Sequence, residues 1–234
     1  MSHHIIDLFN ITKSYGDTEV IKDLTLYIRK NEFITLLGPS GCGKTTTLRI
    51  ISGFEKPDSG RVLFDGVDIT DENMTEKDIY DIRRKVGMVF QNPDNQLVAT
   101  VVEDDVAFGP ENLGIPSAEI RVRVDNALKA VGMYDYRRHA PHLLSGGQKQ
   151  RIGIARALAA EPGFIVADEP VSALDVSVQA QIVNLLEDIR QKTEVAFLFI
   201  AHDLSVVRYI SDRVAVIHKG RIVELAETEE LFEH

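Results

Sequence analysis

A glycine-rich stretch holds the residue types of a phosphate-binding loop. Residues 38–45 read Gly-Pro-Ser-Gly-Cys-Gly-Lys-Thr, which fits the pattern G-x-x-x-x-G-K-[ST]. Glycines permit backbone turns in which successive N–H groups and the N-terminus of the next helix point at one anion. Lys44 supplies a positive charge for the β- and γ-phosphates, and Thr45 supplies a hydroxyl for Mg²⁺. The alternative interpretation is a glycine turn that only precedes a buried helix.

The segments that flank this loop are the ones that phosphate binding requires. The apolar run 33–37 is typical of a strand, and residues 46–51 have the character of a helix. We therefore predict that the loop binds a nucleotide through Gly38, Ser40, Gly41, Cys42, Gly43, Lys44, Thr45 and Thr46. Cys42 has two interpretations, because a thiol beside Lys44 at a helix N-terminus is either reactive or a small residue that fills a tight loop.

The rest of the chain alternates between strand-like and helical patterns. Residues 5–12 and 20–28 have alternating apolar positions on either side of a turn at residues 15–17, and residues 61–65 continue this pattern. Continuously apolar runs, typical of strands buried in a parallel sheet, occupy residues 86–90, 164–168, 195–201 and 214–217. Helical spacing is found over residues 118–131, 147–160 and 176–191.

These patterns predict an α/β fold in a single domain. We expect a P-loop NTPase core with a mostly parallel sheet, an N-terminal antiparallel β-subdomain and an inserted α-helical subdomain. The core would take residues 1–91 and 163–234. The helical insertion would take residues 92–162, where acidic and polar loops are followed by helices. A chain of 234 residues with 44% hydrophobic content is long enough to bury such a core.

Composition excludes several classes of protein. The single cysteine allows no internal disulfide, which fits a reducing, intracellular compartment. No apolar run approaches the roughly 20 residues that span a bilayer, and the N-terminus lacks a secretion signal. A net charge of −10 argues against general nucleic-acid binding. We therefore expect a soluble cytoplasmic protein that binds no nucleic acid and reaches a membrane only through a partner.

Six further features accompany the phosphate loop in a fixed order. They are Tyr15, Gln91, the sequence LSGGQ at 144–148, the run 164–168 with the adjoining Glu169, the sequence SALD at 172–175, and His202. With these features the chain resembles the nucleotide-binding domain of ATP-binding cassette (ABC) proteins over essentially its whole length. LSGGQ is the family's signature sequence, and almost no other P-loop protein carries it.

The resemblance implies a Mg²⁺-dependent ATPase. The ligands of Mg²⁺ would be Thr45, Gln91 and Asp168, and the catalytic residues would be Glu169, His202, Gln91 and Lys44. A carboxylate at the end of a buried strand is costly without a partner, so Asp168 suits Mg²⁺ held through water unless it caps the next loop. Glu169 would position or deprotonate the attacking water. His202 would contact the γ-phosphate, whereas a lone histidine is more often structural.

Other residues would bind the rest of the nucleotide. Tyr15 would stack on adenine, which needs only a π face, although an ordinary turn aromatic is the alternative. In this family the signature of a second subunit covers each ATP in a head-to-tail dimer. Its contacts would be Ser145, Gly146, Gly147, Gln148 and Asp175. A glycine pair before a helix is otherwise often only a cap.

The resemblance implies an ATPase subunit that powers solute import by ATP-driven closure and opening of a homodimer or heterodimer. Such a subunit lies in the cytoplasm, peripheral on the inner face of the cell membrane, and works with transmembrane permease subunits. The alternatives are a non-transport ABC ATPase and a nucleotide-binding scaffold without a membrane partner.

Different stretches of the chain are similar to different ABC importers. Residues 53–60 resemble those of polyamine and sugar importers, residues 91–96 through 108–109 those of energy-coupling-factor importers, and residues 168–224 those of oligopeptide importers. This mosaic is expected of either a chimera or a divergent natural protein. It leaves the transported solute and the identity of the membrane subunits open.

Overall fold

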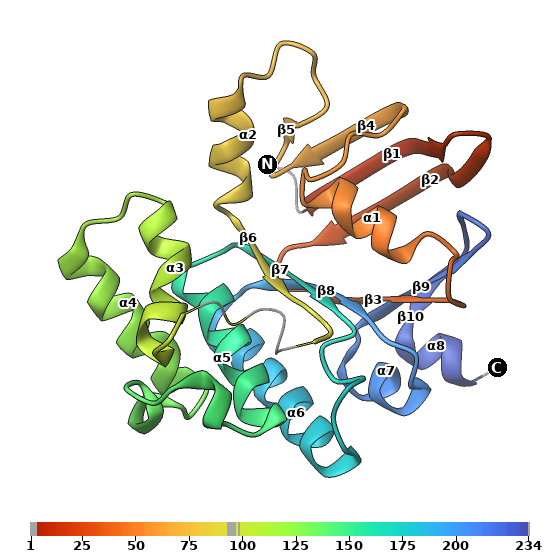
Figure 1. Ribbon diagram of the computed structural model, residues 1–234. Coiled ribbons are helices and arrows are strands. Elements are labelled where there is room, and N and C mark those ends of the chain that lie inside the picture. Colours follow the sequence, from red (N-terminus) through yellow and green to blue (C-terminus); the bar gives the residue numbers. More distant parts are fainter. Residues whose placement is uncertain (1–3, 93–96, 98, 234) are drawn as a thin grey trace.

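The computed structural model of the protein describes residues 4–92, 97 and 99–233. Within that part of the chain, the strands form one sheet of four strands and one of six. Figure 1 shows the six-stranded sheet between two layers, with helix α1 (Lys44–Ile51) and the smaller sheet above it and several helices below it.

The smaller sheet is antiparallel, with the strand order β2-β1-β4-β5. Its strands are β1 (His4–Tyr15), β2 (Thr18–Arg29), β4 (Ser59–Phe64) and β5 (Val67–Asp68). The two-residue turn between β1 and β2 contains Gly16, whose φ of 59° is in the left-handed region that favours glycine. The predicted N-terminal antiparallel subdomain is therefore confirmed, with longer strands than the sequence indicated.

The larger sheet has the order β10-β9-β3-β8-β7-β6. Its strands are β3 (Phe33–Leu37), β6 (Val86–Val89), β7 (Phe164–Asp168), β8 (Ala196–Ile200), β9 (Arg213–His218) and β10 (Arg221–Glu227). All neighbours pair in parallel except β9 and β10. The predicted mostly parallel sheet is confirmed, and the carboxyl ends of β3, β7 and β8 share one edge.

Both faces of β3, β7 and β8 are buried, which explains why these strands are continuously apolar. On β3, Phe33 belongs to the hydrophobic core on the side of the lower helices, whereas Ile34 belongs to the core beneath α1 and the small sheet. Ile165 and Val166 of β7 divide between the two cores in the same way. Because successive strand residues point to opposite faces, no polar face is left along these strands.

Between β6 and β7 the described chain is helical. Its helices are α3 (Val102–Asn112), α4 (Ser117–Ala130) and α5 (Gly146–Ala159), with short 3-10 turns at Tyr134–Tyr136 and Pro141–Leu143. They pack on one another through the buried side chains of Val106, Leu128 and Ile152. The remaining helices are α2 (Glu76–Arg83), α6 (Val176–Thr193), α7 (Leu204–Ile210) and α8 (Thr228–Glu233).

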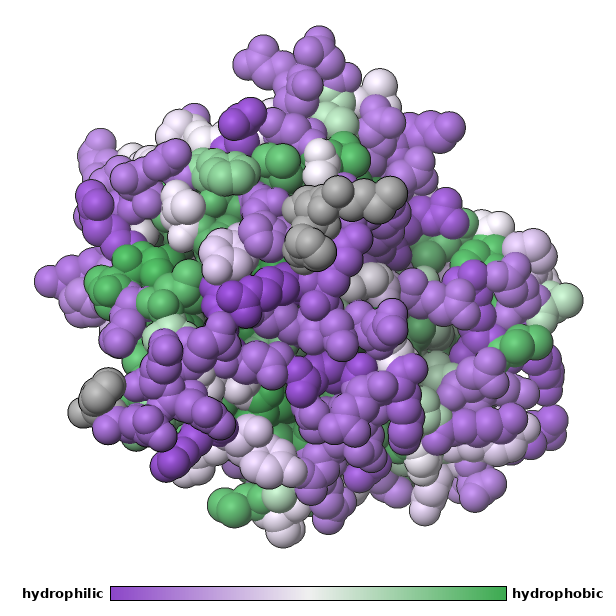
Figure 2. Space-filling model, turned by 180° about the vertical axis from the view of Figure 1, so that it is seen from behind, coloured by the Kyte–Doolittle hydropathy of each residue, from purple (hydrophilic) through white to green (hydrophobic). Residues whose placement is uncertain are grey.

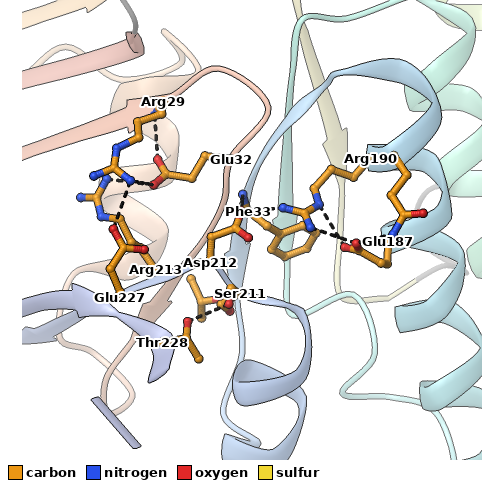
Figure 3. Close-up of polar contacts among 12 residues, drawn as sticks. Arg29, Glu32, Phe33, Glu187, Arg190, Ser211, Asp212, Arg213, Glu227 and Thr228 are labelled. Atoms are coloured by element: carbon orange, nitrogen blue, oxygen red, sulfur yellow. Dashed lines mark hydrogen bonds and ion pairs between the residues drawn. The ribbon is translucent and has the colours of Figure 1, made fainter. Parts of the chain in front are cut away.

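A partly buried polar network stabilises the end of the sheet where β3 begins (Figure 3). Arg213 donates from Nη1 to Glu32 Oε1 at 2.9 Å, and both side chains are only 3% exposed. Asp212 accepts the backbone N–H of Phe33 at 2.8 Å and also pairs with Arg190 of α6. The Arg213 guanidinium also lies 4.3 Å from the centre of the Tyr27 ring, while its Nη2 is buried without a hydrogen-bond partner among the described residues. The network therefore ties β3, β9 and α6 together at the edge opposite the phosphate loop.

Among the described residues, no helix combines the length and the apolar character needed to cross a bilayer. Figure 2 shows that the face behind the view of Figure 1 is largely hydrophilic, with hydrophobic side chains gathered in small separate patches.

Candidate functional site

Three chain segments leave the sheet at the shared carboxyl edge and surround one cleft of about 230 Å³. The cleft is lined by Val20, Ser40, Gly41, Gly43, Lys44, Thr45, Thr46, Glu169 and His202. All of these residues except Val20 were predicted from the sequence. The sheet topology explains why these segments lie together. The strands β3, β8 and β7 are adjacent and parallel, so the segments that follow them leave the same edge of the sheet.

The glycines of the phosphate loop are required by its backbone. Gly41 and Gly43 have φ values of 75° and 106°, which strain any other residue. A Cβ at Gly38 would lie 2.2 Å from the carbonyl oxygen of Ile217, so this position also excludes a side chain. Helix α1 follows directly, and its N-cap, Gly43, makes no side-chain cap hydrogen bond within the described chain. The loop therefore has the form of an anion cradle.

The Lys44 ammonium lies inside this loop. Its Nζ donates to the backbone oxygens of Gly38 and Pro39, the latter at 3.0 Å. Cys42 is only 4% exposed, belongs to the hydrophobic core and lies with Sγ 3.9 Å from Lys44 Nζ. Burial of the thiol favours the interpretation of Cys42 as a small residue that fills the loop.

Two predicted catalytic side chains, His202 and Gln91, contact the carboxylate of a third, Glu169. One of its oxygens contacts His202 Nε2, and the other accepts a hydrogen bond from Gln91 Nε2 at 3.2 Å. The backbone of Glu169 has a φ of 47°, a conformation that costs on the order of 1–3 kcal/mol for a residue other than glycine. It is held there by its N–H, which donates to Ile200 at 3.1 Å, and by Ser172, which donates to its carbonyl oxygen.

Asp168 precedes Glu169 at the end of β7. Burial raises the pKa of Asp168 above its usual value, and the charge of Glu169 adds to this, while Lys44 and His202 act in the opposite direction. Two adjacent carboxylates beside a phosphate cleft suit a cation. In the described chain no three His, Cys, Asp or Glu residues form a metal cage. Oxygen donors from Thr45, Gln91 and Asp168 nevertheless fit Mg²⁺, which is usually held by one or two carboxylates together with phosphates.

The signature residues form a second group outside the lining of this cleft. Ser145 is the N-cap of α5, where its Oγ accepts the N–H of Gln148 at 3.3 Å and Gln148 Oε1 accepts the N–H of Ser145 at 3.0 Å. A Cβ at Gly147 would lie 2.5 Å from Val178 Cγ1, so this glycine allows α5 to approach α6. Asp175 caps α6 by accepting the N–H of Val178 at 3.0 Å. The α5 terminus therefore has a cap, which was the alternative interpretation of its glycine pair.

Comparison with known proteins identifies the family. A family model described as "ABC transporter" matches residues 21–172. The chain belongs to the ABC transporter family. It is an ATPase cassette of that family.

The relatives of this cassette match over nearly its whole length. It is 45% identical to the energy-coupling factor transporter ATP-binding protein EcfA1 of Clostridium novyi, over 99% of this chain and 83% of that protein. The solved structure of cbiO1 from Clostridium perfringens, part of the ABC transporter complex cbiONQ, has a TM-score of 0.92 and 35% identity and covers 100% of this chain and 92% of that one. A dimeric ATP-binding cassette bound to ADP and Pi has a TM-score of 0.83 and 31% identity over 95% of this chain and 98% of that one. Such matches give no support to a chimeric origin.

The cassette also has features that the sequence did not indicate. Val20 lines the phosphate cleft from β2, which no motif marks. A larger groove of about 380 Å³ lies between β6 and α3, where the half-exposed rings of Phe54, Phe90 and Phe108 lie near Arg83. The predicted motif at residues 91–96 is only partly covered, because residues 93–96 lie outside those that the structure describes.

Proposed function

We propose that this cassette powers solute import as the ATP-hydrolysing subunit of an energy-coupling-factor transporter, on the inner face of the cell membrane. The observation that carries the proposal is the convergence of Gln91, Glu169 and His202 beside an open phosphate loop, in a chain 45% identical to an EcfA1 protein. No feature of the described residues favours a cassette acting in translation or DNA repair.

In the proposed mechanism, the loop N–H groups and Lys44 bind the β- and γ-phosphates. ATP oxygens would replace the loop carbonyls that now accept from Lys44. Thr45, Gln91 and Asp168 would hold Mg²⁺, which would neutralise charge that builds up on the transferring phosphoryl group. Glu169 accepts a hydrogen bond from the attacking water, orients it toward the γ-phosphate and takes its proton. His202, which already contacts the Glu169 carboxylate, orients that carboxylate and donates to the γ-phosphate.

The second group of site residues supports a shared site. Ser145, Gly146, Gly147, Gln148 and Asp175 stand outside the lining of their own chain's phosphate cleft. We infer that they cover the nucleotide of a second cassette, which the dimeric form of a related cassette bound to ADP and Pi supports. We divide the domain accordingly, with the nucleotide core in residues 1–91 and 163–234 and the signature in a helical insertion at 92–162.

The groove between β6 and α3 is our candidate for the permease contact. Its phenylalanine rings offer apolar surface, and Phe90 immediately precedes Gln91. The backbone oxygen of Phe90 also accepts a hydrogen bond from the fully buried Gln150 of α5 at 3.2 Å. A permease segment in this groove would therefore lie beside both a residue of the hydrolytic site and the helix that carries the signature.

Co-expression with the membrane subunits of an energy-coupling-factor transporter tests the proposal. We expect the tagged cassette to retain the transmembrane subunits through purification, and reconstituted vesicles to take up solute only with Mg-ATP. Phe108→Glu in the groove should reduce co-purification while the isolated cassette still hydrolyses ATP. Glu169→Gln, as the matched control, should assemble but not transport. A cassette that hydrolyses ATP and assembles with no permease would support the scaffold alternative.

A further inference from the structure

A cluster of charged side chains lies against Tyr15, the residue that we propose as the adenine platform. Lys13 Nζ is 5.6 Å from the centre of the Tyr15 ring. The same ammonium donates to the backbone oxygen of Lys56 at 2.7 Å and pairs with Glu55 at 3.0 Å and Asp58 at 3.3 Å. The Lys13 side chain is only 13% exposed. The cation therefore has one fixed place beside the ring.

The loop that supplies these partners connects α1 to β4, and it is fastened to β1 on both sides of Lys13. Asp58 accepts the backbone N–H of Ser14 at 2.7 Å, and its own N–H donates to the Thr12 oxygen at 2.8 Å. Helix α1, which begins at the phosphate loop, is thus followed by a loop that contacts β1 next to Tyr15. The two ends of a bound nucleotide would be connected through α1.

The hydrogen bonds of the cluster favour the ionised forms of Lys13, Glu55 and Asp58. The hydrogen bond with Glu55 is the largest cause of a raised pKa for Lys13, and the same bond lowers the pKa of Glu55. The hydrogen bond from Ser14 is the main cause of a lowered pKa for Asp58. A cation near an aromatic ring attracts it electrostatically, and the attraction is larger when the cation is withdrawn from water. Lys13 therefore acts on the ring as a permanent charge.

We propose that Lys13 is a positioning residue for the nucleotide base. It holds the Tyr15 ring against one side, so that the opposite, solvent-facing side is ready to receive adenine. Tyr15 is 46% exposed, which leaves ring surface for a base. Fixing the ring before ATP arrives removes part of the ordering cost of binding. The inference rests on the proposed use of Tyr15 in stacking.

Binding of two ligands separates this role from a structural one. The affinities of ATP and of inorganic tripolyphosphate are measured calorimetrically with Mg²⁺, because only ATP has a base. Lys13→Met should raise the Kd of ATP by about threefold to tenfold, the range expected for loss of a cation–π contact. The Kd of tripolyphosphate should not change, and Lys13→Arg should restore most of the ATP affinity.

The matched control is Lys30→Met, which removes another ion-paired lysine, bound to Asp65 at 2.8 Å beyond the far end of the same hairpin. It should change neither affinity. Glu55→Gln keeps the cation but loosens it and also weakens the hydrogen bond between Tyr15 and Glu55, so it should give a smaller loss confined to ATP. This variant keeps the inference testable if Lys13→Met folds poorly.

A double-mutant cycle with Tyr15→Ala distinguishes the two proposals. In the Tyr15→Ala background, Lys13→Met should cause no further loss of ATP affinity. An equal loss of ATP affinity with and without Tyr15, or an equal loss of tripolyphosphate affinity, would overturn the inference. Lys13 would then only hold the loop between α1 and β4 in place. If Tyr15→Ala alone leaves ATP binding unchanged, the stacking proposal fails and the inference fails with it.

Discussion

Two glycine-rich helix N-termini of this cassette are built in opposite ways. Helix α1 begins after Gly43 without a side-chain cap within the described chain, and its first turn faces the phosphate cleft. Helix α5 begins after Ser145 with a complete capping box formed with Gln148. Side-chain acceptors that are already in place compete with a ligand for the same N–H donors. The open terminus is therefore ready for phosphate, whereas the capped one is complete as it stands.

The glycines differ in purpose as well. Gly41 and Gly43 take backbone conformations that favour glycine, so they shape an anion cradle. Gly147 instead permits close contact between α5 and Val178 of α6. A glycine pair before a helix thus has a packing function that is independent of any anion. Whether the α5 terminus also serves a nucleotide depends on a second subunit, and the first two predictions address this dependence.

The largest expected effect comes from Glu169→Gln, which leaves both helix termini intact. The amide cannot accept the proton of the attacking water, so turnover should fall by about 100-fold or more. ATP binding should persist, and the bound nucleotide should hold a dimer in size-exclusion chromatography with Mg-ATP. Turnover at the parent rate would remove Glu169 from its catalytic role.

Mixing two inactive variants tests whether the two termini meet across subunits. Lys44→Ala removes the charge of the α1 site, and Ser145→Arg blocks the α5 terminus by bulk. If the α5 terminus acts on the partner's nucleotide, mixed dimers contain one site with both parts intact and one with both parts defective. Each variant alone should stay monomeric with Mg-ATP, and the mixture should form dimers again.

Dimer formation is the better measurement in this experiment, because hydrolysis in two coupled sites can require both of them. The concentration dependence of the parent protein provides the control. A specific ATPase activity that stays constant down to concentrations at which the protein is wholly monomeric would contradict a shared site.

Local patterns predicted the open terminus well and the convergence of side chains poorly. The run 33–37, the glycines and Lys44 are contiguous, so one motif contains the strand, the loop and the helix. The contact of Gln91 and His202 with one carboxylate depends on strand order, which the sequence did not give, and only the family resemblance assigned these residues to one site. The positive φ of Glu169 leaves no mark in the sequence.

The elements that the sequence patterns missed include α3, β10 and α7. Helix α3 has a buried Asp105 and an internal Pro110, both of which oppose an amphipathic helical pattern. Strand β10 is exposed along most of its length and pairs only with β9, so few of its residues need to be apolar. Helix α7 has seven residues, fewer than a periodic pattern needs. Tertiary packing therefore decides these elements.

A smaller effect is expected from Ser145→Ala, which opens the capped terminus. Loss of the serine cap should lower the free energy of unfolding by about 1 kcal/mol, because the N–H of Gln148 loses its acceptor. ATP binding to the monomer should not change, since Ser145 does not line the cleft of its own chain. Urea unfolding and nucleotide titration measure the two quantities. Weaker ATP binding by the monomeric variant would place Ser145 in its own chain's site.

The smallest effect distinguishes the α5 terminus from that of α6, which packs against it. The α6 cap is Asp175, a group that titrates, whereas Ser145 does not. Hydrogen bonds from the Ser177 hydroxyl and the Val178 N–H lower the pKa of Asp175 below its usual value. The folded protein therefore binds this proton less readily than the unfolded chain, so the cap contributes stability above the ordinary aspartate pKa and loses it as the pH falls through the lowered value.

Asp175→Asn keeps an oxygen acceptor but cannot titrate, so the stability difference between the parent and this variant should shrink on acidification. Ser145→Ala should show a difference from the parent that is constant over the same pH range. A constant difference for both variants in urea unfolding would mean that the hydrogen bonds of Asp175 do not depend on its charge.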